Sequence, residues 1–199
     1  MSGRVLMNSA ASRSEAALGQ VACEEIAGRP APRVLIGGLG MGCTLRAALD
    51  CLPVDAHVAV VELNEAVLRW CRGPLARLTD GAVDEPRVEV RLGDVADAIR
   101  EAARPGASPF DAILLDLYEG PHPASPPSDH AHYGAAALAR TRAALDANGI
   151  LAIWSEDPDP VFERSLGRAG FAVRLHRPGG GGRRHAIYIA RALPPRQSA

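Results

Sequence analysis

The sequence predicts an α/β fold in which a seven-stranded, mostly parallel sheet has helices on both faces and ends in an antiparallel hairpin. Short apolar runs alternate along the chain with segments of helical periodicity, a pattern typical of parallel sheets. Two of these runs, VAVVEL and AILLDL, are almost continuously apolar, as expected for central strands covered on both faces. The last two runs are joined by RPGGGGRRH, which is too short for a helical crossover, so these two strands must pair antiparallel.

The individual elements follow from these patterns. The predicted strands occupy residues 33–38, 57–63, 87–93, 110–118, 149–156, 171–176 and 186–193. The predicted helices occupy residues 14–28, 44–52, 64–78, 95–104, 133–146 and 160–170. The run RVEVRL alternates between apolar and polar residues, which favours an edge position. We expect a helical lead-in over 1–32, one domain over 33–193 and a short tail over 194–199.

The composition is that of an ordinary globular protein. Of the 199 residues, 47% are hydrophobic, and the formal net charge is −1. This balance and an aromatic content of only 4% offer no footprint for nucleic acid. No apolar run approaches the length of a membrane span, and the N-terminus lacks the apolar core of a signal peptide. We therefore expect a cytoplasmic protein without a nucleic-acid or membrane partner.

The cysteines give no sign of a metal site. Cys23, Cys43, Cys51 and Cys71 form no CxxC pair, and they fall within predicted helices or at a helix start. Buried free thiols in a reducing cytosol are the favoured interpretation, with a metal site or a disulfide as the alternatives.

A cluster of glycines follows the first predicted strand. The segment IGGLGMGCTLR places four glycines in six positions immediately before a predicted helix. A dinucleotide-binding loop needs G-x-G-x-x-G, but counting from Gly38 puts Cys43 at the third glycine position. The pattern present is G-x-G-x-G, with Gly38, Gly40 and Gly42. This spacing lets a strand turn into a helix while backbone N–H groups face the amino-acid end of a cofactor; the alternative is a tight turn without a ligand.

Acidic residues follow the next two strands. Glu62 ends the second strand, twenty residues beyond Gly42, where a carboxylate can accept hydrogen bonds from both hydroxyls of a ribose. Asp94 follows the third strand and opens a helix, so it can serve as an N-cap. In the same loop, Asp94 can also accept from an adenine amino group, with the Val95 N–H close to the ring.

The loop after the fourth strand carries the candidate catalytic residues. Asp116 ends an apolar strand and emerges at the carboxyl edge of the sheet, where ligands bind in open α/β folds. Tyr118 and Glu119 follow in the same loop. The next segment, PHPASPPSDHAHY, is long enough to form a lid or a substrate wall. Its three histidines, at 122, 130 and 132, have no metal-binding spacing, and solvated loop residues are favoured over catalytic bases.

These motifs together resemble the spermidine synthases. GLGMGCTLR resembles GGGDGGTLR of that family, and VVELN, DEPRVEVRLGDVADAI and FDAILLDLYEGP follow in the family's order. The resemblance covers roughly Val5 to Ala190. It implies the Rossmann-like class I methyltransferase fold, in which five strand–helix units are closed by a hairpin. It also implies an adenosyl-sulfonium cofactor, held by Gly38, Gly40, Gly42, Glu62, Asp94 and Asp116.

Three departures separate this sequence from that family. Spermidine synthases carry an N-terminal β-rich domain that helps shape the polyamine tunnel, and we expect no room for it here. The acid in the family's glycine loop, which meets the terminal amine of the cofactor, corresponds to Met41, whose thioether cannot pair with an ammonium. The family's paired aspartates become Asp116 and Glu119, with Leu117 and Tyr118 between them.

These departures affect polyamine recognition and leave the adenosine half of the site unchanged. The leading hypothesis is therefore a methyltransferase that uses S-adenosylmethionine, whose carboxylate the glycine-loop N–H groups can bind. Its acceptor would be a small-molecule or peptide nucleophile, which Asp116, Glu119 or Tyr118 orients or deprotonates. The alternatives are an aminopropyltransferase that uses decarboxylated S-adenosylmethionine, and a cofactor-binding protein without turnover. We also expect that the exposed edge hairpin can pair two copies into a homodimer.

Overall fold

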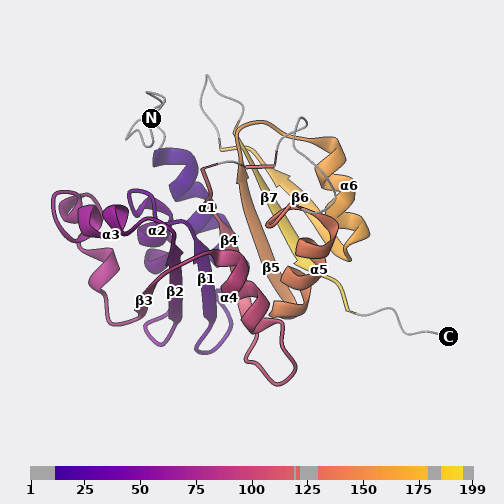
Figure 1. Cartoon of the computed structure of the whole chain (residues 1–199), viewed down its shortest axis with the longest axis horizontal. Coiled ribbons are helices and arrows are strands. Elements are labelled where there is room, and N and C mark those ends of the chain that lie inside the picture. The colour runs from indigo at the N-terminus through magenta and orange to yellow at the C-terminus, as the bar shows by residue number, and fades with distance from the viewer. Residues whose placement is uncertain (1–11, 119, 122–129, 179–184, 195–199) are drawn as a thin grey trace.

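The predicted fold class is confirmed. A computed structural model describes residues 12–118, 120–121, 130–178 and 185–194. The strands form one seven-stranded sheet in the order β3-β2-β1-β4-β5-β7-β6 (Figure 1). They are β1 (Arg33–Gly37), β2 (His57–Glu62), β3 (Val88–Leu92), β4 (Phe110–Leu115), β5 (Leu145–Ser155), β6 (Phe171–His176) and β7 (Ala186–Ala192). The helices are α1 (Ser12–Glu24), α2 (Cys43–Cys51), α3 (Glu65–Arg72), α4 (Val95–Ala102), α5 (Ala135–Ala144) and α6 (Pro160–Arg168).

The pairing pattern also follows the prediction. Strands β1 to β5 pair in parallel, whereas β7 pairs antiparallel with both β5 and β6. The alternating strand β3 lies at one edge and pairs with β2. The hairpin partner β6 lies at the other edge.

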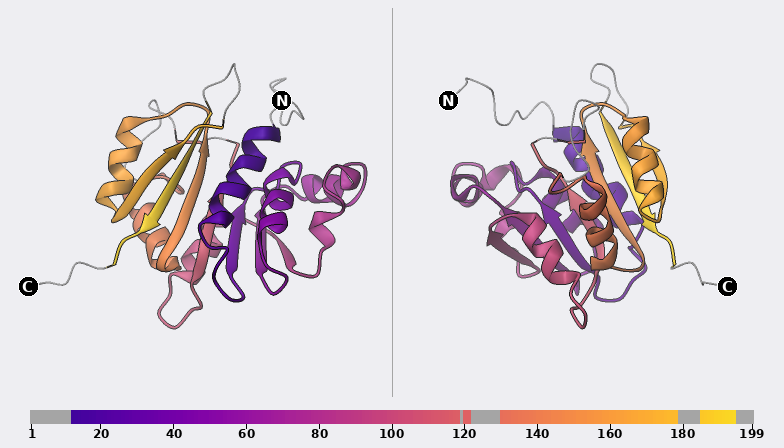
Figure 2. Two further views of the ribbon diagram at one scale, coloured as in Figure 1. Left: turned by 180° about the vertical axis from the view of Figure 1, so that it is seen from behind. Right: turned by 45° about the vertical axis from the view of Figure 1, so that its right-hand side comes forward.

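The sheet is covered on both faces, which explains its apolar central strands. Helices lie against both faces of the sheet (Figure 2). One hydrophobic cluster joins the sheet to α1, α2 and α3, and a second joins it to α4, α5 and α6. Along β4, Leu114 points into the first cluster and Leu115 into the second, and both are fully buried. Burial of each such leucine contributes about 1.5–3 kcal/mol. The lead-in helix takes part in this core, because Leu18 of α1 is fully buried in the first cluster.

Several elements differ from their predicted bounds: α1 ends at Glu24 instead of residue 28, β4 ends at Leu115 instead of residue 118, and two further elements differ for a clear physical reason. The predicted helix 64–78 ends at Arg72, because Pro74 has no N–H to donate and its ring obstructs a continuing helix. Two short 3₁₀ turns, Ala76–Leu78 and Ala82–Asp84, follow instead. The strand predicted from residue 149 begins earlier, at Leu145, through an irregularity in its pairing with β4 in which Asn148 takes a positive φ of 59°.

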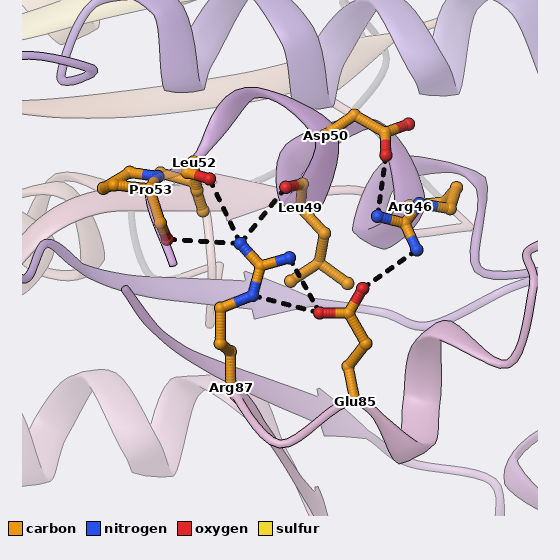
Figure 3. A network of polar contacts seen from close by, with 7 residues as sticks. All are labelled: Arg46, Leu49, Asp50, Leu52, Pro53, Glu85 and Arg87. Atoms are coloured by element: carbon orange, nitrogen blue, oxygen red, sulfur yellow. Dashed lines mark hydrogen bonds and ion pairs between the residues drawn. The ribbon is translucent and has the colours of Figure 1, made fainter. Parts of the chain in front are cut away.

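A network of polar contacts fixes the start of β3 (Figure 3). The Arg87 guanidinium donates to the carbonyls of Leu49, Leu52 and Pro53 at 3.1–3.2 Å, at the C-terminal end of α2. The Glu85 carboxylate accepts from Arg87 and also from Arg46. Arginine thereby satisfies helix carbonyls that have no intrahelical partner, and it ties the edge strand to α2. No helix in the described part of the chain is long and apolar enough to cross a membrane.

Candidate functional site

The predicted site residues meet along one edge of the sheet. The glycine loop follows β1, Glu62 ends β2, Asp94 follows β3 and Asp116 follows β4. These four strands are neighbours and run in parallel, so their carboxyl ends lie side by side. Each of the four predicted groups therefore lies at this carboxyl edge of the sheet, where ligands bind in open α/β folds.

The glycine loop has the backbone that its spacing predicts. Gly38, Gly40 and Gly42 have φ values of 86°, 52° and 82°, in the left-handed region that favours glycine. At Gly38 an added Cβ would lie 2.3 Å from the backbone oxygen of Asp116, so the loop approaches the end of β4 closely. At Gly40 an added Cβ would meet open space. Met41, between Gly40 and Gly42, is buried with 8% of its surface exposed.

Glu62 supports the glycine loop from the neighbouring strand. Its carboxylate accepts from the Leu39 N–H and from the Asn64 N–H, each at 2.8 Å. The side chain is buried, so these bonds hold it in one orientation. Each carboxylate oxygen keeps a further lone pair, which leaves capacity for the hydroxyls of a ribose. The ribose-binding role of Glu62 stays a prediction.

Asp94 caps α4, as one of its two predicted roles requires. Its carboxylate accepts from the Ala96 N–H at 2.8 Å, and His132 Nε2 lies 3.1 Å from the same oxygen. Partial burial acts to raise the pKa of Asp94, but the bonds from Ala96 and His132 outweigh it and lower the pKa. Val95 is buried at the first position of α4 and packs against the position of Gly37. The adenine-binding roles of Asp94 and Val95 stay predictions.

Asp116 points toward α1 and α2. Its Oδ2 lies 2.5 Å from the Thr44 hydroxyl, and that hydroxyl lies 3.1 Å from the Glu15 carbonyl oxygen. The single hydroxyl proton cannot serve both oxygens at once. When Asp116 is ionised, Thr44 donates to it. When Asp116 is protonated, it can donate to Thr44, which then donates to the Glu15 carbonyl. The network therefore accommodates both protonation states.

The surroundings of Asp116 hold its proton up to neutral pH. Burial, and next the negative charge of Glu15, raise the pKa of Asp116 to about 7, although Thr44 acts in the opposite direction. Burial also raises the pKa of Glu15, which the hydrogen bond from Cys43 opposes. No salt bridge within the described ranges joins Glu15 or Asp116 to a basic side chain. Two carboxyl groups therefore share this corner without a counter-ion, an arrangement that attracts a cation.

The rest of the predicted catalytic loop is only partly described. Tyr118 is 53% exposed at the carboxyl edge, and Leu117 packs into the second hydrophobic cluster. Glu119 and His122 lie outside the described residues, so the predicted carboxylate pair of Asp116 and Glu119 stays a prediction. Within the described residues, the second carboxyl group beside Asp116 is Glu15, which the sequence reasoning missed.

Other groups also differ from the expectation. His132 was expected in a solvated loop, yet it contacts Asp94, and His130 stacks on the Tyr133 ring at 5.1 Å between centroids. The four cysteines are free thiols, but only Cys23 and Cys71 are buried, whereas Cys43 and Cys51 are partly exposed. Over the described ranges, no three His, Cys, Asp or Glu side chains form a group that could hold a metal ion.

The fold is the Rossmann-like fold of class I methyltransferases. No protein-family model matches the chain. It is similar to human methyltransferase-like protein 13 in complex with SAH, with a TM-score of 0.66 at 20% identity over 93% of this chain and 82% of that one. It is also similar to spermidine synthase from Thermotoga maritima, with a TM-score of 0.66 at 21% identity over 90% of this chain and 60% of that one.

Sequence similarity confirms the resemblance to the spermidine synthase group. The chain is 37% identical over 119 residues to polyamine aminopropyltransferase 1 of Hyperthermus butylicus, and the match covers 60% of this chain and 39% of that protein. It is 38% identical over 90 residues to polyamine aminopropyltransferase 1 of Streptomyces coelicolor, covering 44% of this chain and 16% of that protein. The chain thus spans well under half the length of these curated relatives.

Proposed function

We propose that this chain is an S-adenosylmethionine-dependent transferase, and within that class a methyltransferase on a spermidine-synthase-like core. The observation that carries the proposal is the glycine loop, in which three alternate glycines with positive φ lie directly beside the Glu62 carboxylate. This arrangement places two features at the same edge of the sheet: the glycine backbone, which has no side chains to shield it, and the Glu62 carboxylate, which can accept hydrogen bonds from ribose hydroxyls. The similarity to polyamine aminopropyltransferases and to methyltransferase folds supports a sulfonium cofactor in that place.

Met41 favours the intact cofactor over its decarboxylated form. The resemblance puts an acid at this position in spermidine synthases, where it meets an amine. Here the side chain is a thioether and it is buried, so the loop itself offers no negative charge. The N-terminus of α2 instead presents N–H groups that have no intrahelical partner, and such groups bind a carboxylate well.

In the proposed reaction a substrate nucleophile attacks the sulfonium methyl in line, and the bound cofactor supplies this activated group. The residues of the chain position the two reactants and exclude water, and no strong catalyst is needed beyond that. Asp116, with a pKa of about 7, can take a proton from an attacking amine at neutral pH. Thr44 orients its carboxyl group. Tyr118 and Glu119 complete the proposed catalytic loop, and the acceptor is a small-molecule or peptide nucleophile.

An aminopropyltransferase is the second candidate, and two observations favour it. The curated relatives carry that name. In addition, Glu15 and Asp116 share one corner of the site without a counter-ion, which suits the decarboxylated cofactor, whose ammonium is not accompanied by a carboxylate. In this second reading the decarboxylated cofactor would bind more tightly than the intact one.

Product analysis tests these candidates directly. The purified chain is incubated with methyl-labelled S-adenosylmethionine and a panel of amine and peptide acceptors, and separately with decarboxylated S-adenosylmethionine and a diamine. Mass spectrometry then detects a methyl or an aminopropyl addition. The double variant Asp116→Asn, Glu119→Gln is the matched control, and it should form no product. A wild-type chain that binds cofactor and transfers neither group would instead support a binding protein without turnover.

A further inference from the structure

The geometry points to β3 as a dimerisation edge, at which two copies of this chain pair their β3 strands antiparallel around Val90. Strand β3 ends the sheet and pairs with β2 on its inner side. Its outer side chains are open to solvent: Glu89 and Arg91 are exposed, and Leu92 is 53% exposed. This inference is independent of the proposed reaction, because it rests on the backbone and the side chains of the edge strand alone.

The backbone hydrogen bonds show which groups of β3 face outward. The Arg87 carbonyl accepts from the Val58 N–H at 2.8 Å, and the Gly93 N–H donates to the Glu62 carbonyl at 2.9 Å, so both residues face β2. Because the direction alternates along a strand, Val88, Val90 and Leu92 direct their backbone groups away from β2. The Val88 N–H is already bonded to the Glu85 carbonyl. The carbonyl of Val88 and the backbone N–H and C=O groups of Val90 and Leu92 therefore face outward, where another strand can pair with them.

The sequence of β3 is complementary to itself in the antiparallel register centred on Val90. Val90 then lies opposite the partner's Val90, and their outward N–H and C=O groups bond to each other. Leu92 lies opposite the partner's Val88, so its N–H meets the free carbonyl there. The N–H of Val88 is already bonded to Glu85 within its own chain, so the partner's Leu92 carbonyl opposite it gains no bond. The register therefore forms two bonds between the Val90 residues and one at each Leu92–Val88 pair.

The charges match the same register. Glu89 and Arg91 lie on the same face of β3 and form an ion pair within one strand, at 2.8 and 2.9 Å. In the proposed pairing, Glu89 lies opposite the partner's Arg91, and Arg91 lies opposite the partner's Glu89. These positions face each other without backbone hydrogen bonds, so their side chains approach most closely, with Cβ atoms about 4.5–5.5 Å apart. Each in-strand ion pair can then become part of a network of four charges.

The surroundings of β3 favour this edge over the opposite one. The Arg87 network ties the start of β3 to α2, so the strand is held in place before a partner arrives (Figure 3). A cavity of about 550 Å³ lies beside the edge on the α4 face, with Glu89 and Arg91 among the residues that line it. By contrast, the edge strand β6 carries Arg174 and His176 and no acid, and Arg174 is paired with Glu25 of α1. Charge complementarity thus selects β3 as the dimer edge instead of the hairpin.

Charge reversal tests the proposal, with the mass in solution measured by size-exclusion chromatography and light scattering over a range of concentrations. The wild-type chain should be a dimer. The single variants Glu89→Arg and Arg91→Glu place like charges opposite each other and should be monomers. An equimolar mixture of the two single variants should form a heterodimer, because each then meets the opposite charge. The double variant Glu89→Arg, Arg91→Glu restores complementarity and should again be a dimer.

A proline variant tests the backbone pairing of β3 separately from the charges of Glu89 and Arg91. Val90→Pro removes the outward N–H and leaves the bonds to β2 intact, so it should give a folded monomer by circular dichroism and light scattering. A monomeric wild-type chain over the whole concentration range would overturn the proposal. So would a dimer that persists in both single variants and in Val90→Pro, because the interface would then lie elsewhere.

Discussion

Replacement of Asp116 by asparagine should remove a pH-dependent loss of stability. The carboxyl group keeps its proton up to about pH 7 in the folded chain, whereas its ordinary pKa is 3.8. Below pH 3.8 both states are protonated and the group has no effect on stability. Between pH 3.8 and 7 the unfolded chain releases the proton and the folded chain retains it, so the free energy of unfolding falls as the pH rises. Above pH 7 the loss is complete.

The size of this effect follows from the two pKa values. One pKa unit corresponds to about 1.4 kcal/mol, so the full difference amounts to about 4 kcal/mol of lost stability above pH 7. Between pH 5 and pH 8 the expected change is about 2.5 kcal/mol. Both figures are upper values, because solvent reaches part of the Asp116 side chain. Asparagine has a similar shape and carries no charge, so Asp116→Asn should be free of this loss.

Urea unfolding of both proteins at several pH values measures the effect. The free energy of unfolding of Asp116→Asn relative to the wild type should increase by up to about 2.5 kcal/mol between pH 5 and pH 8. The matched control is Asp80→Asn, at an exposed position whose positive φ asparagine tolerates, and it measures the effect of replacing an aspartate outside this corner. A difference between Asp116→Asn and the wild type that is constant over this range would refute the assignment of a partly buried Asp116 that keeps its proton up to about pH 7.

Substitutions at three further positions test other parts of the site. Glu15→Gln removes the negative charge beside Asp116, so the pH midpoint of the stability difference described above should move to lower pH, and an unchanged midpoint would show that Glu15 does not act on Asp116. Gly38→Ala should lower the free energy of unfolding in urea by more than about 1 kcal/mol, because φ is 86° and the added Cβ would meet the Asp116 oxygen; a neutral effect would contradict that contact. Asp94→Ala should cost about 1 kcal/mol through loss of the cap of α4, whereas Asp94→Asn should keep most of it.

Much of the fold could be predicted because its signals are local. The continuous apolar runs predict central strands, and the structure places β2 and β4 in the interior of the sheet. The alternate glycines predict positive φ values, which all three have. The helix over 64–78 was predicted too long, because the apolar periodicity continues past Gly73 and Pro74 although the backbone cannot. Proline there was a stronger signal than the periodicity.

The surroundings of Asp116 could not be predicted, because they depend on packing between distant segments. Glu15 lies about a hundred positions away in the sequence, and only the packing of α1 against α2 and β4 brings it close. In the sequence alone, an acid in an amphipathic helix indicates a solvent-facing position. The same holds for His132, whose contact with Asp94 joins the loop after β4 to the loop after β3, although β1 and β2 separate these strands in the sheet. Its only sequence signal was its place in the long loop after β4.

Calorimetric titration with the cofactor is the most direct test of the proposed site. S-adenosylmethionine and its decarboxylated form are titrated separately into the wild-type chain and into Glu62→Gln, with circular dichroism as the check on folding. The proposed site predicts that the intact cofactor binds more tightly than the decarboxylated one, and that Glu62→Gln weakens binding by about tenfold or more, since a charged hydrogen-bond acceptor is lost. Tighter binding of the decarboxylated form would contradict the methyltransferase and favour aminopropyl transfer. Binding of neither form would contradict the assignment of the glycine loop and Glu62 as a cofactor site.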